Sequence, residues 1–273
     1  MNRTQLHRTR SSSTSLALGH VHVFARRERS VMQFASVTTR RLIAAAMGLM
    51  VSMPAMATNV EQETCSIPDG IVNNLQAKLA VVVKAPDANG GLFSPNLMWS
   101  AVVDRKGLLC SVIRSDPDAW PGSRSIAIAK ASTANNFSNS QLALSTAMLY
   151  SFTQPANSGP ANGGFPAGSL YGLNNSNPFN PMFQEQGSGL REVPGGIITF
   201  GGGVPLYSGG KVIGGLGVSG DTACADHAIA FRMRKLAGLD GTPGSDNITY
   251  LAVGELPHDF GHPHCHIGKD ITP

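Results

Sequence analysis

Basic residues are scarce in this sequence once its first 57 residues are set aside. The formal net charge of +4 for all 273 residues includes eight Arg and a single Glu within residues 1–57. Residues 58–273 contain 13 Lys and Arg against 16 Asp and Glu, a net charge of 13 − 16 = −3, and no cluster of basic side chains. This mildly acidic composition gives no support for nucleic acid or an anionic membrane surface as a partner.

The sequence also lacks the short motifs that mark common catalytic and cofactor-attachment sites. It contains no G-x-S-x-G nucleophile elbow, no H-E-x-x-H metal motif, no C-x-x-C pair and no C-x-x-C-H attachment site. No catalytic arrangement therefore emerges, and we predict no catalytic residues.

One strongly apolar run is present, over residues 42–57, directly after a pair of Arg residues. It is about sixteen residues long and ends in the triplet Ala-Met-Ala, so the sequence predicts a secretory signal peptide, residues 1–57, cleaved after Ala57. A transmembrane anchor is the alternative, but the run is short and contains Pro54. A true start at Met32 would give a signal of ordinary length. We therefore predict a periplasmic or secreted protein without a stable membrane anchor.

All four cysteines follow the predicted signal peptide, at Cys65, Cys110, Cys224 and Cys265. An even number of cysteines in an exported chain predicts two disulfides. The sequence allows three pairings. We favour Cys65–Cys110 with Cys224–Cys265, because the second pair would tie the start of a helix to an otherwise loose, proline-bearing tail.

The first half of the chain reads as helices around a hairpin. Apolar spacing predicts a helix over residues 70–85, and two β-rich runs around the turn Asp-Arg-Lys-Gly predict a hairpin over residues 97–116. A helix with Ser123 as its N-cap residue is expected over residues 121–137. A second helical segment is expected over residues 139–152.

The second half begins with a change in composition. Residues 154–195 are rich in Gly, Asn and Pro and predict a long surface excursion. Strands are predicted within residues 196–218, beginning with the run Gly-Ile-Ile-Thr-Phe, and a helix over residues 222–238 that ends at Gly238. Residues 247–256 are expected to add a last strand or edge segment, and the tail after them is irregular.

Three glycines have the G-x-G-x-x-G spacing of a dinucleotide-binding loop. They are Gly215, Gly217 and Gly220, and Asp240 lies about twenty residues further on. The order of elements argues against a nucleotide site, because it lacks the alternating strands and helices of a parallel sheet. Asp240 also follows a helix end rather than a second strand. We expect these glycines to lie in or beside a strand, where a missing side chain lets a helix or another backbone approach closely.

Two ordered segments resemble the haem-binding HbpS-like family, also called GlcG-like. The run GGGVPLYSGGKVIGGLGVSGDTACADHAIA resembles the family's G-G-x-P-[IL] and G-V-S-G signature, followed by a helix with an acidic residue. Upstream, AVVDRKGLLCSVIRSD and IAIAKASTANNF resemble its V-x-D…G hairpin and A-x-x-K-A-x-T-A helix. The resemblance covers most of residues 70–238.

This resemblance implies an α+β fold with a profilin-like or PAS-like antiparallel sheet covered by helices. It implies a single domain, residues 58–273, that forms a homo-oligomer. The signal peptide, the four cysteines, the excursion over residues 154–195 and a His-rich tail over residues 257–273 set the chain apart from compact members. It is similar to the exported, long-form branch of the family.

His227 and Asp226 are candidate cofactor-binding residues at the start of the last predicted helix. That helix begins after Gly220, with Asp221 or Thr222 as its N-cap. Near a helix N-terminus the dipole disfavours a protonated imidazole, so His227 would be neutral and available to a metal, although adjacent Asp226 opposes this effect. The family places an acidic residue at the position of Asp226. A histidine that only packs or caps locally is the alternative.

Lys130 and Thr133 match the family's K-A-x-T motif and are candidate cofactor-binding residues together with Arg114. With Asp104 and Asp116 they form a polar set that the fold could bring near the glycine-rich strands. The resemblance implies a pocket in which Lys or Arg pairs with a carboxylate such as a haem propionate. A buried hydrogen-bond network that joins a helix to the hairpin is the alternative.

Four histidines crowd around Cys265 near the C-terminus: His258, His262, His264 and His266. Imidazole suits haem iron, zinc or copper, so these residues and His227 are candidate metal ligands. Gly261 and Pro263 argue against a regular helix, and a disulfide at Cys265 would remove its thiolate. A solvated tail held by its disulfide is the alternative.

Three functions are compatible with these observations. The leading hypothesis is an exported haem-binding protein, a carrier, a store or the partner of a sensor, with haem bound non-covalently. A periplasmic accessory factor or small enzyme linked to organic-acid or alcohol oxidation, with a small organic acid as ligand, is the second. A structural oligomer without a ligand of its own is the third.

Overall fold

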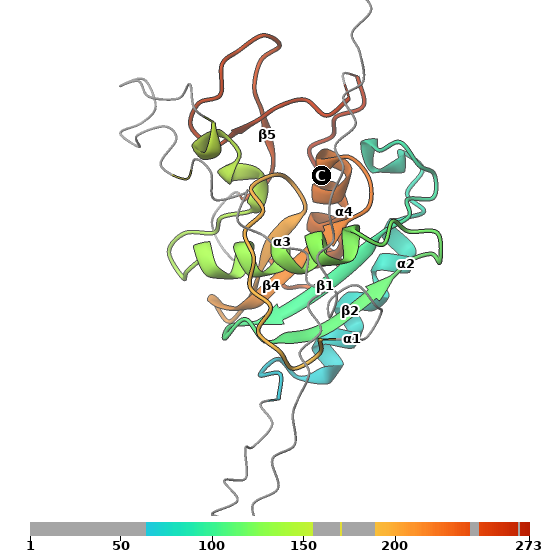
Figure 1. The fold of residues 1–273 in the computed structure, drawn as a ribbon, viewed down its shortest axis with the longest axis vertical. Coiled ribbons are helices and arrows are strands. Elements are labelled where there is room, and N and C mark those ends of the chain that lie inside the picture. The colour runs from blue at the N-terminus through green and yellow to red at the C-terminus, as the bar shows by residue number, and fades with distance from the viewer. Residues whose placement is uncertain (1–63, 155–169, 171–188, 241–245, 267) are drawn as a thin grey trace, which may run out of the picture. The chain divides into compact units, whose positions relative to one another are not determined.

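A four-stranded antiparallel sheet lies at the centre of the fold (Figure 1). The structure is a computed structural model that describes residues 64–154, 170, 189–240, 246–266 and 268–273. The predicted signal peptide and most of the predicted excursion lie outside the described residues. The described chain forms a single α+β domain, as the sequence predicts.

The sheet joins two hairpins through their inner strands. Its strands are β1 (Trp99–Asp104), β2 (Leu109–Arg114), β3 (Gly203–Ser208) and β4 (Lys211–Ser219). Their spatial order is β2-β1-β4-β3, and every neighbouring pair is antiparallel. The predicted first hairpin is confirmed. Its turn is held by Asp104, whose Oδ1 accepts hydrogen bonds from the backbone N–H groups of Lys106 and Leu108.

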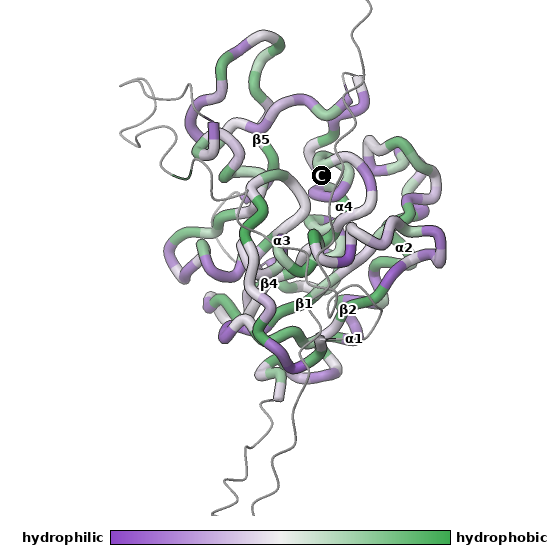
Figure 2. The backbone as a smooth tube through the Cα atoms, viewed as in Figure 1, coloured by the Kyte–Doolittle hydropathy of each residue, from purple (hydrophilic) through white to green (hydrophobic). Residues whose placement is uncertain are grey.

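Helices cover both faces of the sheet because side chains along each strand alternate between the faces. The helices are α1 (Asp69–Ala77), α2 (Leu79–Val82), α3 (Ser123–Phe137) and α4 (Ala223–Leu236). On β1, Trp99, Ala101 and Val103 pack with α3, whereas Val102 packs on the opposite face with α1, α2 and α4. The hydrophilic stretches of the chain lie mainly at the outer turns (Figure 2).

Two glycines of β4 allow α3 to lie directly against the strand. A Cβ atom at Gly217 would lie 1.9 Å from the carbonyl oxygen of Ala127, and one at Gly215 would lie 2.1 Å from that of Ala131. Any larger residue would push the helix away from the sheet. The strand interpretation of these two glycines is confirmed, and the G-x-G-x-x-G run is not a loop that could hold a dinucleotide.

The last helix has the ends that the sequence predicts. Thr222 is the N-cap of α4, and its hydroxyl accepts a hydrogen bond from the N–H of Ala225. Gly238 follows the helix with φ +68°, the left-handed conformation that glycine tolerates. Asp221, the other N-cap candidate, accepts hydrogen bonds from the N–H of Phe93 and the amide of Asn96, and so anchors a distant loop.

Two details of the predicted helices are corrected. The helix expected over residues 70–85 is divided at Lys78 into α1 and α2, and it ends at Val82. Ser123 is the first residue of α3 rather than its N-cap, which is Gly122, and no side chain caps the helix.

The predicted helical segment over residues 139–152 is wrong. Two short 3-10 turns, η2 (Thr146–Leu149) and η3 (Ser151–Thr153), form there. Polar side chains capture the backbone N–H groups that a helix would use. The Oδ1 atom of Asn139 accepts hydrogen bonds from the N–H groups of Gln141 and Leu142. The hydroxyl of Ser138 accepts one from the N–H of Leu144.

The strand predicted at the beginning of residues 196–218 is also wrong. The N–H of Ile198 donates to the hydroxyl of Thr133 on α3, at 2.9 Å, rather than to a neighbouring strand. The chain enters the sheet at Gly203, the first residue of β3.

Both predicted disulfides are confirmed. Cys65–Cys110 links the segment before α1 to β2, and Cys224–Cys265 links the start of α4 to the C-terminal tail. Each bond closes a loop of about forty residues, for which the chain-entropy model gives a stabilisation of roughly 4 kcal/mol.

The tail folds back on the domain without joining the main sheet. Residues Thr249–Tyr250 (β5) pair in parallel with Gly261–His262 (β6), so the predicted last segment forms a separate two-stranded bridge. No helix of the described part of the chain is long and apolar enough to cross a membrane.

Candidate functional site

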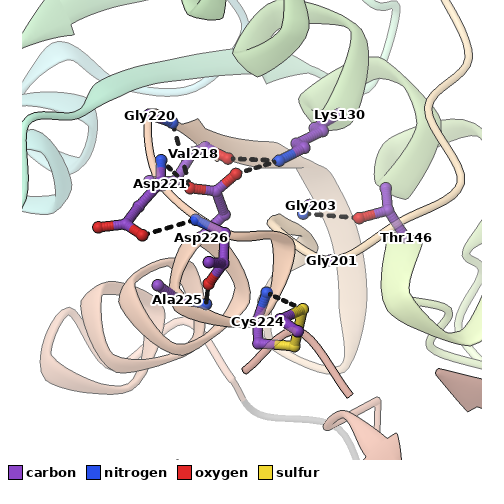
Figure 3. A network of polar contacts seen from close by, with 12 residues as sticks. Lys130, Thr146, Gly201, Gly203, Val218, Gly220, Asp221, Cys224, Ala225 and Asp226 are labelled. Carbon is purple, nitrogen blue, oxygen red and sulfur yellow. Dashed lines mark hydrogen bonds and ion pairs between the residues drawn. A yellow bond between two sulfur atoms is a disulfide. The ribbon is translucent and has the colours of Figure 1, made fainter. Parts of the chain in front are cut away.

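A buried ion pair joins α3 to α4 beside the end of β4 (Figure 3). Lys130 Nζ lies 2.6 Å from Asp226 Oδ2, and the two side chains are 0% and 2% exposed. Lys130 Nζ also donates to the carbonyl of Val218 at 3.1 Å, while Asp226 Oδ1 accepts from the backbone N–H groups of Gly220 and Asp221. The two residues that match separate family motifs therefore contact each other.

Backbone and an aromatic ring enclose the ammonium group of Lys130. A Cβ atom at Gly202 would lie 2.7 Å from Lys130 Nζ and 2.8 Å from the Cβ of Asp226. The ring centre of Phe200 lies 4.8 Å from Nζ, a cation–π distance. The absence of a side chain at Gly202 is thus required for the ion pair to fit.

Burial shifts both pKa values of the pair toward the neutral forms. It raises the pKa of Asp226 to about 6 and lowers that of Lys130, and in each case the opposite charge of the partner counteracts the effect. At neutral pH the carboxylate is ionised and its charge is matched by Lys130. A carboxylate ligand would have to displace Asp226 to reach Lys130.

Thr133 and Arg114 make other contacts. The Thr133 hydroxyl donates to the carbonyl of Ala129 in its own helix and accepts from the N–H of Ile198, so it fastens the chain before β3 to α3. Arg114, at the end of β2, lies over the ring of Trp99 at 5.7 Å and is exposed. Neither side chain contacts the ion pair.

The two remaining acids of the predicted polar set hold turns. Asp104 Oδ2 accepts hydrogen bonds from the N–H and the hydroxyl of Ser66, besides the turn contacts described above. Asp116 accepts one from the N–H of Asp118. The structure therefore brings together Lys130 and Asp226, but not the whole set.

His227 follows Asp226 on α4 and is fully buried. Its Nε2 atom lies 3.2 Å from Asn247 Oδ1 and donates to it, whereas Nδ1 has no hydrogen-bond partner among the described residues. Burial lowers the pKa of His227 to about 3. The imidazole is neutral, as the sequence predicts, but burial rather than the helix dipole is the main cause.

His262 is buried next to the same stretch of backbone as His227. Its Nδ1 atom donates to the carbonyl of Pro263 at 2.8 Å, and its Nε2 accepts from the N–H of Gly201 at 3.2 Å. Gly201 also lies close to His227, since a Cβ atom added at Gly201 would lie 3.0 Å from the Cβ of that histidine. Burial lowers the pKa of His262 to about 4. Its ring is buried, and backbone groups hold both of its nitrogens, so His262 is less accessible than a histidine at the surface.

The disulfides remove two arrangements that would otherwise suit a metal ion. Ligand-type atoms of Cys224, His262 and Cys265 lie within 4.8 Å of one another, but the two sulfurs are bonded to each other. Ligand-type atoms of Cys65, Asp104 and Cys110 also lie within 4.8 Å of one another, but the sulfurs of Cys65 and Cys110 are likewise bonded to each other. A disulfide sulfur is not a thiolate ligand.

His258 is the tail histidine beside a surface pocket. Its side chain is 39% exposed, with Nε2 2.7 Å from Glu255 Oε1 and Nδ1 3.3 Å from Asp259 Oδ2. These hydrogen bonds raise the pKa of His258. The residue lines a pocket of about 260 Å³ whose walls also include Tyr250 and Phe260.

The other two tail histidines differ from each other. His264 stacks on Tyr250, with ring centres 5.5 Å apart, and its Nδ1 lies 2.8 Å from Asp270 Oδ2. His266 is exposed.

A haem group fits the tail better than the buried centre. His227 is fully buried, so a porphyrin could not reach its Nδ1 atom without a local rearrangement of the fold. At His258 an accessible imidazole stands beside aromatic walls, the chemistry that a haem iron and its ring require. The pocket is smaller than the ~300–1,000 Å³ of sites that enclose a ligand, so it could cover only part of a porphyrin.

The chain matches a family described as haem degrading protein HbpS-like, over residues 96–234. The match includes the whole main sheet, α3, most of α4 and both members of the Lys130–Asp226 pair. The chain belongs to the HbpS-like family. The histidine-rich tail of this HbpS-like chain lies beyond the matched residues.

Several solved structures are similar to this HbpS-like chain. The complex of PduOC with haem is 24% identical and is matched over 62% of this chain and 94% of that chain, with a TM-score of 0.44. The Klebsiella pneumoniae protein ORFY is 28% identical over 66% and 96%, with a TM-score of 0.43. A double mutant of HbpS from Streptomyces reticuli is 21% identical over 74% and 99%, with a TM-score of 0.40. No curated protein matches the chain.

Sequence reasoning missed the residues that complete these sites. The three-residue spacing of Glu255 and His258 in a turn-rich tail was a usable signal for their contact. No local signal places Phe200 over Lys130 or Asn247 beside His227. The path of the chain into β3 brings the first pair together, and the return of the chain after α4 brings the second pair together.

Proposed function

We propose that this HbpS-like chain is an exported haem-binding protein that holds haem non-covalently, as a carrier, a store or the partner of a sensor. Membership of the HbpS-like family, shown by the match over residues 96–234, is the observation that carries the proposal. The predicted signal peptide and the two disulfides support export, because disulfides persist in oxidising compartments.

His258 is the proposed iron ligand. It combines exposure, a neighbouring pocket and the aromatic rings of Tyr250 and Phe260. One carboxylate partner, Glu255 or Asp259, would keep its hydrogen bond to the imidazole when the other ring nitrogen binds iron, which orients the ring and raises its basicity. Haem would supply the iron and the porphyrin, while the chain would supply this imidazole and an apolar wall.

His227 is the second proposed ligand. Its ring is neutral and its Nδ1 lacks a partner in the described structure, as a metal ligand requires. However, the ring is fully buried, and the Cys224–Cys265 disulfide fixes the start of the helix that carries it, so binding there would require a rearrangement that the fold opposes. We therefore rank His227 below His258.

A hemin titration of the exported, oxidised protein tests the proposal. We expect a saturable change of the Soret band, weakened about tenfold or more by His258→Ala because an iron ligand is lost. His266→Ala is the matched control, since it removes an exposed histidine from the same tail without touching the pocket. His227→Ala tests the buried alternative.

The outcomes separate haem binding from the choice of ligand. A saturable change that persists in His258→Ala and is lost in His227→Ala would transfer the ligand role to the buried histidine. No saturable change in the unaltered protein would overturn the proposed function.

A further inference from the structure

A groove between α2 and α4 lies on the face of the sheet that α1, α2 and α4 cover, and none of the candidate site residues discussed above lines it. The two helices pack against each other on that face (Figure 1). The groove has a volume of about 630 Å³. Its lining residues are Val81, Val82, Lys84, Ala85, Pro86, Asp87, Arg232, Lys235 and Leu236. The volume lies within the ~300–1,000 Å³ typical of small-molecule sites.

The walls of the groove are largely apolar, and its rim is exposed. Two aliphatic side chains that line the groove are largely exposed: Val81 is 63% exposed and Leu236 is 57% exposed. Ala85 and Pro86 also contribute to the apolar lining. Adjoining exposed apolar side chains commonly mark a binding surface, because covering them removes hydrocarbon from water.

The charges of the groove favour an anion. Arg232 is held by Asp87 through two hydrogen bonds, at 2.9 and 2.6 Å, and by the amide oxygen of Asn89. The ion pair lowers the pKa of Asp87 to about 2, so this carboxylate remains ionised and committed to Arg232. Lys84 and Lys235 are exposed, and no other acid lines the groove.

The lining therefore carries three cations against one anion, whereas residues 58–273 as a whole carry a net charge of −3. Lys235 also stands in the last turn of α4, where a cation stabilises the helix. Stabilisation of the helix end explains the position of Lys235, but it does not explain why Lys84 and apolar side chains line the same groove.

We propose that this groove binds an amphipathic carboxylate, an alkyl or ring system that ends in a carboxylate group. Lys84 and Lys235 hold the carboxylate at the rim, and Val81, Pro86 and Leu236 cover the apolar body. The groove shares no residue with the pocket beside His258, the proposed iron ligand. A free fatty acid and haem, through its propionate groups, both present a carboxylate on an apolar body. The experiment below distinguishes these two sources.

Calorimetric titration of the exported protein with decanoate, and with decanol as the uncharged probe, tests the assignment. We expect saturable binding of decanoate and weaker binding of decanol. Lys84→Ala combined with Lys235→Ala should weaken decanoate binding about tenfold without changing decanol binding, because two charge-assisted hydrogen bonds are lost. Lys211→Ala, an exposed lysine at the start of β4 outside the groove, is the matched control.

A second variant tests the apolar wall. Leu236→Glu places a carboxylate in the groove and should abolish decanoate binding by charge repulsion, and an unchanged thermal unfolding midpoint would show that the fold is intact. Hemin that displaces decanoate would identify haem as the source of the carboxylate, and hemin that binds without displacing it would identify an alkyl acid.

Equal affinity for decanoate in the unaltered protein and the double lysine variant would overturn the proposal. So would the absence of decanoate binding together with a dimer that Leu236→Glu dissociates in sedimentation, since a second copy of the chain would then cover the groove. Neither result depends on the Soret titration of His258, so failure here is separate from failure of the proposed function.

Discussion

The buried centre around Lys130 and the C-terminal tail contain the same kinds of side chain, yet they differ in what those side chains can reach. In the centre, Lys130 and Asp226 satisfy each other, and His227 is enclosed. In the tail, His258 is 39% exposed beside a pocket. Access, more than residue type, separates a structural polar group from a candidate ligand site.

The comparison also assigns different physical roles to the two regions. A buried ion pair contributes little net stability over an apolar pair, but removal of one partner leaves an uncompensated charge in the interior. Lys130–Asp226 therefore fixes how α3, β4 and α4 meet. The tail is held by a disulfide, a two-residue bridge and hydrogen bonds such as that from the N–H of Gly201 to His262, and its exposed side chains can change without disturbing the sheet.

Removal of one charge from the centre should have the largest effect. Lys130→Met leaves Asp226 buried and unpaired, so we expect the free energy of unfolding to fall by about 3–5 kcal/mol in urea denaturation with the disulfides intact. Lys130→Met combined with Asp226→Leu should recover much of the loss. A single variant that loses less than about 1 kcal/mol would mean that the centre does not depend on the pair.

Removal of the tail disulfide should come next. Cys224→Ala with Cys265→Ala should lower the free energy of unfolding by roughly 3–4 kcal/mol, because the bond closes a loop of 41 residues. The tail should then be cleaved by protease before the sheet. Cys65→Ala with Cys110→Ala is the matched control: it should lose similar stability while the tail stays protected. Equal protection of the tail in both variants would contradict this assignment.

The pH dependence of stability distinguishes the two regions by a smaller effect. Because the pKa values of buried His227 and His262 are lowered to about 3 and 4, the unfolded chain binds more protons than the folded chain below pH 6.5. Stability from these residues is complete above pH 6.5 and is lost as the pH falls. Asp226, with its pKa raised to about 6, opposes the loss between pH 6 and 3.8.

We therefore expect a net loss of roughly 2–3 kcal/mol between pH 7 and 5, measured by urea denaturation at each pH. His227→Leu should remove about half of the histidine contribution. His266→Ala, an exposed tail variant, should leave the curve unchanged. Identical curves for His227→Leu and the unaltered protein would show that burial of His227 does not control this dependence.

The same contrast explains which parts of the structure could be predicted from the sequence. The first hairpin, α3 and α4 follow from local patterns, namely alternation on β1 and helical spacing. The sequence allowed three disulfide pairings, and the favoured one is the pairing observed. The segment over residues 139–152 failed because the side chains of Ser138 and Asn139 take up backbone donors, a competition that apolar spacing does not register.

Burial was the property that the sequence could not supply. Family motifs drew attention to Lys130 and Asp226 but did not show that each would be the other's partner. His227 and His258 have the same side chain, and their difference arises from the path of the chain after α4, which places Asn247 against one and leaves the other at the surface.

Exchange of His258 for alanine should have the smallest effect on stability. It therefore tests directly whether the tail, unlike the buried centre, can lose a side chain without loss of stability. Its hydrogen bonds join it to Glu255 and Asp259, which are themselves exposed, so water can solvate both carboxylates once the imidazole is removed. We expect no measurable change in the thermal unfolding midpoint of His258→Ala, whereas His227→Ala, which opens a cavity in the interior, should lower it. If hemin affinity falls in His258→Ala while the midpoint stays constant, the residue acts on the ligand rather than on the fold. A midpoint lowered as much as in His227→Ala would instead make His258 part of the structural framework.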